Sequence, residues 1–84
     1  DDAYLRGFAK AASASGGPVF LRWASEMNGT WTAYSGNPWL YRTKFRLVAR
    51  VFRQEAPNVA MVWTPYCTPR GPIPDYYPGD DAVD

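Results

Sequence analysis

The stretch RWASEMNGTW, residues 22–31, places a single carboxylate, Glu26, shortly after the apolar run PVFL of residues 18–21. A glutamate at the end of a buried strand can act as a general acid and base, or it can hydrogen-bond a ligand without reacting. It can also form a structural ion pair with Arg22, because side chains an even number apart along a strand share a face. Spacing alone leaves these three interpretations open.

The composition excludes several catalytic and metal-binding chemistries within this chain. It contains no histidine, which removes Ser-His-Asp and Cys-His nucleophile pairs and any zinc site that needs imidazole. The one cysteine, Cys67, cannot form an internal disulfide, and we interpret it as a packing residue. Nine Lys and Arg side chains oppose eight Asp and Glu side chains, so net charge selects neither nucleic acid nor a membrane as partner.

Apolar residues at helical spacing predict two helices. The first covers residues 2–14 and ends at the glycines of residues 16–17. The second covers residues 38–54, with Asn37 as N-cap and Pro38 at the first helical position. Its apolar stripe steps by four, three and four residues: Tyr41, Phe45, Val48 and Phe52.

Two short apolar segments, residues 18–24 and 59–64, predict strands buried on both faces, as in parallel sheets. Helix and strand therefore alternate, and a proline-rich irregular connection follows, which indicates an α/β architecture. Two strands leave unpaired edges, and a closed barrel takes roughly 250 residues. We therefore interpret residues 1–84 as one partial domain, a fragment of a (β/α)8 TIM barrel, with a compact two-strand domain as the alternative.

The residues around Glu26 resemble the end of the fourth strand in glycoside hydrolase family 26, the retaining barrel enzymes best known as endo-β-1,4-mannanases. The run FLR of residues 20–22 matches the approach, and EMNG of residues 26–29 matches the motif itself. Trp31 and Tyr34 fall at the aromatic positions that follow.

The resemblance extends beyond this motif. Residues 59–63 look like the fifth strand of the family, and residues 76–81 look like the segment that leads into its sixth strand. It thus covers nearly the whole chain but only the middle third of a full barrel.

The resemblance implies that Glu26 is the catalytic proton donor, which protonates the leaving oxygen and later activates water. A retaining enzyme also needs a carboxylate nucleophile about 5–5.5 Å away. In the family this nucleophile lies at the end of the seventh strand, and no residue of this chain matches it, so the chain alone is expected to be inactive. Asp80 and Asp81 would lie at the opposite face, and we assign them a structural or capping role.

The resemblance also implies a set of substrate-binding residues. Ser25 stands where the family has a histidine that helps to shape the sugar site, and a serine is shorter and cannot carry charge. Aromatic side chains in strand-end loops can stack on sugar rings, and Asn28 can hydrogen-bond a sugar hydroxyl or hold the loop. The expected substrate-binding residues are Ser25, Asn28, Trp31, Tyr34 and Tyr66.

We therefore expect a retaining β-mannan hydrolase that acts on a polysaccharide or oligosaccharide outside the cell, with no cofactor or metal and with neither nucleic acid nor membrane as partner. The chain shows no signal-peptide pattern. One alternative is a non-catalytic, glycan-binding barrel in which Ser25 marks lost chemistry. Another is that four arginines of the second helix bind phosphate backbones, although a solvated helix face explains them as well: Arg42, Arg46, Arg50 and Arg53.

Overall fold

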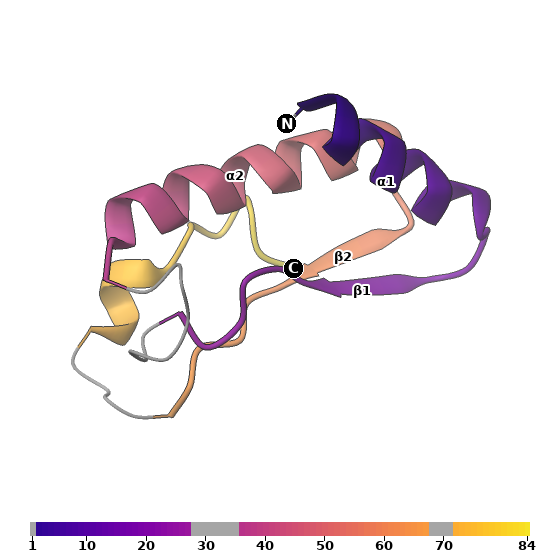
Figure 1. The fold of residues 1–84 in the computed structure, drawn as a ribbon. Coiled ribbons are helices and arrows are strands. Elements are labelled where there is room, and N and C mark those ends of the chain that lie inside the picture. Colours follow the sequence, from indigo (N-terminus) through magenta and orange to yellow (C-terminus); the bar gives the residue numbers. More distant parts are fainter. Residues whose placement is uncertain (1, 28–35, 68–71) are drawn as a thin grey trace.

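The computed structural model describes residues 2–27, 36–67 and 72–84, and Figure 1 shows it as a ribbon. Its elements, in chain order, are the helix α1 (Asp2–Ala14), the strand β1 (Val19–Arg22), the helix α2 (Pro38–Glu55), the strand β2 (Val59–Val62) and the 3₁₀ turn η1 (Ile73–Tyr76). The two strands pair in parallel, as the alternation of helix and strand predicts. Neither helix of the described ranges is long and apolar enough to cross a membrane.

Local signals account for the ends of both helices. α1 is followed by Gly16, whose φ of 77° lies in the left-handed region that glycine adopts without a steric penalty. Asn37 caps α2, because its side chain accepts a hydrogen bond from the Leu40 N–H at 3.0 Å, and Pro38 follows at the first helical position. α2 ends at Glu55, one residue beyond the predicted boundary.

The strands are buried on one face only, whereas the sequence predicted burial on both. α1 and α2 lie on the same side of the two strands in Figure 1. Leu21 and Met61, which pair in register, pack into the core on that side, and Met61 is fully buried. On the other face Phe20 is 74% exposed. The prediction is wrong for the described chain because both helices cover the same face of the sheet.

α2 supplies much of the core through its predicted stripe. All four stripe residues are at most 3% exposed: Tyr41, Phe45, Val48 and Phe52. Trp23, directly after β1, packs on two of them, with ring centroids 5.7 Å from Tyr41 and 6.1 Å from Phe45. These contacts fix the end of β1 against the first half of α2.

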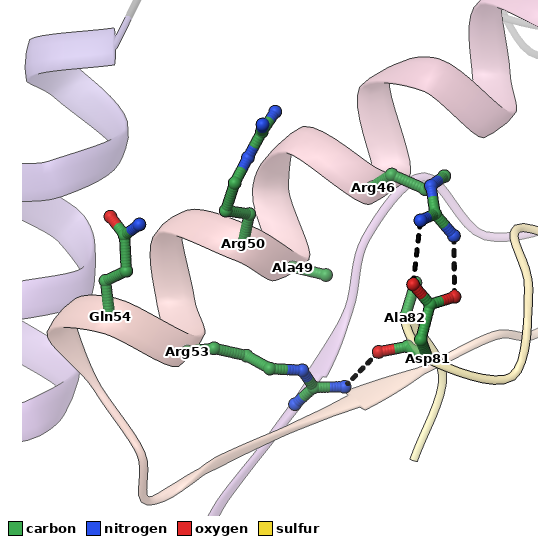
Figure 2. A pocket seen from close by; sticks show the side chains of 7 residues that line it. All are labelled: Arg46, Ala49, Arg50, Arg53, Gln54, Asp81 and Ala82. Atoms are coloured by element: carbon green, nitrogen blue, oxygen red, sulfur yellow. Dashed lines mark hydrogen bonds and ion pairs between the residues drawn. The ribbon is translucent and has the colours of Figure 1, made fainter.

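The C-terminal residues 77–84 run from η1 back along α2 toward the strands (Figure 1). Arg46 donates two parallel hydrogen bonds to the Asp81 carboxylate, both at 2.7 Å, as Figure 2 shows. Arg53 Nη1 lies 3.1 Å from Asp84 Oδ2. We call this set of contacts the C-terminal clasp. Its bond from Arg46 holds the pKa of Asp81 below the ordinary value of an aspartate, and it confirms the structural role expected for Asp81.

The last residue of the clasp, Asp84, binds the edge of β2 that does not pair with β1. The Asp84 N–H donates to the Met61 carbonyl at 3.0 Å, and the Met61 N–H donates to Asp84 Oδ2 at 2.7 Å. β1 pairs along the other edge of β2. Both backbone groups of Met61 are therefore satisfied on the side that β1 does not cover.

The arginines of α2 lie on a face that is open to water, and most of them also bind residues from the C-terminal part of the chain. Arg42 donates to the backbone carbonyl of Asp75, and Arg46 and Arg53 hold the C-terminal clasp. Arg50 is the one member of the set without a bonding partner among the described residues. The face is thus exposed to water, as the interpretation of a solvated helix face expected, and three of its four arginines also bind residues near the end of the chain.

Candidate active site

The chain leaves β1 through a turn in which two residues have left-handed backbone conformations. Ala24 has a φ of 51° and Glu26 a φ of 59°. A residue with a side chain pays roughly 1–2 kcal/mol in this region. Such strain persists only where the surrounding structure enforces it, and it is concentrated at functional sites. The turn is therefore a candidate site on backbone geometry alone.

Contacts on both sides of Glu26 hold this turn. The Glu26 N–H donates to the Thr64 carbonyl at 2.8 Å, which ties the turn to the segment directly after β2. The next side chain, Met27, is fully buried in the core. Glu26 is consequently fixed beside the carboxyl ends of both parallel strands, the end at which α/β sheets carry their ligand sites.

The structural ion pair with Arg22 does not form. The Nε atom of Arg22 donates to Thr64 Oγ1 at 3.4 Å, and within the described residues no ion pair joins Arg22 to Glu26. Arg22 lies at the last position of β1 and is exposed. Proton transfer and hydrogen bonding to a ligand stay as interpretations of the half-buried Glu26 side chain, in addition to the contacts that it makes within the protein.

The predicted substrate-binding residues are described only in part. Ser25 lies between the two left-handed residues and is half-buried. Tyr66 follows β2 at the same end of the sheet and is 42% exposed. Asn28, Trp31 and Tyr34 lie outside the described residues.

The chain on either side of residues 28–35 is anchored. Met27 is buried before this segment, and after it the Gly36 N–H donates to the Tyr76 hydroxyl at 2.9 Å. Tyr76 is itself only 4% exposed, and its ring lies 5.7 Å from that of Tyr41. Sequence reasoning missed this anchor, because the bond joins positions 40 residues apart and no local pattern distinguishes Tyr76 from Tyr77.

Four of the other acids of the described chain bind groups away from Glu26. Glu55 pairs with Arg6 at 2.9 Å, Asp80 accepts a hydrogen bond from the Tyr77 hydroxyl, and Asp81 and Asp84 belong to the C-terminal clasp. Residues 28–35 and 68–71 contain no acidic residue in the sequence. We assign one carboxylate to the site, Glu26, which can donate or accept a proton but is half of the pair that a retaining glycosidase needs.

Two further expectations concern metals and the cysteine. The described residues contain no group of three or more His, Cys, Asp or Glu side chains that could hold a metal ion. Cys67 is exposed, so its interpretation as a packing residue is wrong. The segment that carries it has already left β2, which ends at Val62.

Comparison with known proteins gives two relatives by sequence. The chain is 39% identical over 72 residues to a β-1,3-xylanase, TXYA, of a Vibrio species and 36% identical over 72 residues to a β-1,3-xylanase of an Alcaligenes species. Each match covers 80% of this chain and 15% of the relative, so the chain spans a small part of the length of these relatives. No family model and no solved structure matches. The chain is therefore related in sequence to glycosidases, and these relatives do not support the mannanase type in particular.

Proposed function

We propose that the chain is part of a retaining β-glycoside hydrolase in which Glu26 is the acid and base. The observation that carries the proposal is the strained turn, which fixes Glu26 beside the carboxyl ends of two parallel strands through the bond to Thr64. The similarity to two β-1,3-xylanases and the Glu-Met-Asn-Gly motif of family 26 support the same chemistry.

In this proposal Glu26 first protonates the glycosidic oxygen while a second carboxylate attacks the anomeric carbon. It then removes a proton from the water that hydrolyses the glycosyl-enzyme. The nucleophile belongs to a part of the protein beyond this chain. A (β/α)8 barrel would supply it, and the uncovered strand face with its exposed Phe20 is what an unfinished barrel interior would leave.

The proposed substrate is β-1,3-xylan, taken from the names of the two relatives. Ser25 distinguishes the chain from the histidine-containing pattern of the mannanases, since a hydroxyl group offers a shorter and uncharged contact to the sugar. β-1,4-Mannan, the substrate implied by the family resemblance, is the competing candidate. Because either polymer is too large to enter a cell, we place the reaction outside it.

The test is release of reducing sugar by the full-length protein from β-1,3-xylan, β-1,4-xylan, β-1,4-mannan and β-glucan. We expect hydrolysis of β-1,3-xylan that falls about 10²–10⁴-fold in Glu26→Gln, the usual contribution of general acid and base catalysis. Glu55→Gln is the matched control, because it removes a carboxylate that pairs with Arg6 at the end of α2. This variant should keep full activity.

A substrate with a good leaving group separates proton donation from substrate binding. An aryl β-xyloside that releases a dinitrophenolate needs little protonation, so its cleavage should survive Glu26→Gln far better than that of xylan. Equal losses on both substrates would make Glu26 a binding residue. A folded protein that binds these polymers and hydrolyses none would instead be the non-catalytic relative.

A further inference from the structure

A hollow of about 380 Å³ lies beside α2, and no residue of the turn that holds Glu26 lines it; Figure 2 shows its lining side chains. Its apolar lining comes from Ala49 and Ala82, which are 3% and 4% exposed. Its charged lining has three arginines and one aspartate, which leaves a net charge of +2: Arg46, Arg50, Arg53 and Asp81. A hollow with an excess of positive charge concentrates anions.

Two of these arginines are already occupied by the C-terminal clasp. Arg46 binds both carboxylate oxygens of Asp81, and Arg53 donates to Asp84 Oδ2 at 3.1 Å and to the Asp81 carbonyl at 3.2 Å. These bonds hold both side chains in place and leave the guanidinium of Arg50 without a partner among the described residues. Figure 2 shows it apart from the pair formed by Arg46 and Asp81.

Gln54 adds a neutral donor to the same hollow. It lies four residues after Arg50, and residues at this spacing are neighbours on a helix surface. Its Oε1 atom accepts a hydrogen bond from Arg6 at 3.2 Å, which orients the amide and leaves its NH₂ group as a donor. Arg50 and Gln54 therefore offer N–H groups from positions four residues apart on α2, and no described residue accepts a hydrogen bond from them.

We propose that this hollow binds one tetrahedral oxyanion, phosphate or sulfate, through the guanidinium of Arg50 and the side-chain amide of Gln54. The planar fork of an arginine matches two oxygens of such an ion. A nucleic acid is a poorer fit, because tight binding of a polyanion requires several free cationic groups, and three of the arginines on α2 are occupied.

The test is calorimetric titration of the full-length protein with inorganic phosphate and with inorganic sulfate at constant ionic strength. We expect saturable binding of one ion, weakened about tenfold in Arg50→Gln, as loss of a charged hydrogen-bonding group implies. Arg50→Lys, which keeps the charge and loses the fork, should give a smaller loss. Methyl phosphate in place of phosphate tells whether the site takes a free ion or an ester.

Lys44→Gln is the matched control, because it removes one exposed positive charge from another position of α2. This variant should bind the ion within twofold of the wild type, and unchanged melting temperatures show that all variants are folded. If anion binding does not saturate, or if Lys44→Gln and Arg50→Gln weaken it equally, the proposed oxyanion site is wrong. Tight binding of duplex DNA that both variants weaken equally would replace it by a general polyanion surface.

Discussion

At the scale of single residues, the turn after β1 holds two residues in backbone conformations that their residue types disfavour. Neither Ala24 nor Glu26 belongs to the residue types that tolerate left-handed conformations well, yet both adopt them. The buried Met27 and the bond from the Glu26 N–H to Thr64 compensate for the strain. A relaxed turn would let the carboxylate move relative to the strand ends, whereas the proposed catalysis requires a proton donor in a fixed position.

Substitutions of Ala24 test this strain. Ala24→Val should destabilise the full-length protein by about 1–2 kcal/mol, because a β-branched residue is a severe outlier at a φ of 51°. Ala24→Gly should cost less than about 0.5 kcal/mol or stabilise the protein, since relief of strain offsets the extra freedom of the unfolded chain. Urea denaturation measures both values. A Val variant as stable as the Gly variant would show that the turn is unstrained.

At the scale of elements, α2 could be predicted almost completely, because its determinants are local. Asn37, Pro38 and the apolar stripe from Tyr41 to Phe52 define a cap, a start and a buried face within a few residues of one another. The partners of its arginines could not be predicted in this way. Asp81 lies 35 residues beyond Arg46, and spacing along the helix contains no information about it.

In the candidate active site, too, local features could be predicted from the sequence, whereas contacts between distant residues could not. The identity of Glu26 as the candidate acid follows from a contiguous motif and from the end of a predicted strand. Its left-handed backbone, its bond to Thr64 and the anchoring of Gly36 by Tyr76 all depend on residues far apart in sequence. Burial of the strands on both faces was wrong for the described chain, because burial is a property of neighbours and both helices lie on one face.

We expect the C-terminal clasp to stabilise the folded protein by an amount that depends on pH. Arg46 lowers the pKa of Asp81, and the Met61 N–H and Arg53 lower that of Asp84. A carboxylate whose pKa is lower in the folded state stabilises the protein above its unfolded pKa, and it loses this contribution as the pH falls through the folded value. The difference in melting temperature between wild type and Asp81→Asn should therefore shrink between about pH 5 and pH 2.

Asp75→Asn is the control for this measurement. Asp75 lies in the same C-terminal region, but its backbone carbonyl, rather than its carboxylate, accepts the bond from Arg42. Its variant should follow the wild-type pH profile. A constant difference between wild type and Asp81→Asn over the whole range would mean that the ion pair with Arg46 contributes nothing to stability.

At the scale of the whole molecule, one face of the two strands is covered by the helices and the other is exposed. α1, α2 and the clasp cover one side of the strands, while Phe20 is 74% exposed on the other. The relatives are several times longer, since the match covers 15% of each. A barrel would bury this second face in its interior and bring a nucleophile toward Glu26, so the fold proposal and the catalytic proposal both depend on further strands of the proposed barrel.

Phe20 therefore tests the barrel in the full-length protein. If further strands cover this face, Phe20→Ala should destabilise the protein by about 3–5 kcal/mol, the usual cost of deleting a buried phenylalanine side chain. Phe20→Leu, which nearly conserves volume, should cost less than about 1.5 kcal/mol. If the face remains in water, both substitutions should stay within about 0.5 kcal/mol of the wild type, and the barrel proposal fails. Chemical denaturation followed by tryptophan fluorescence measures these differences, because Trp23 packs against the core at the end of the same strand.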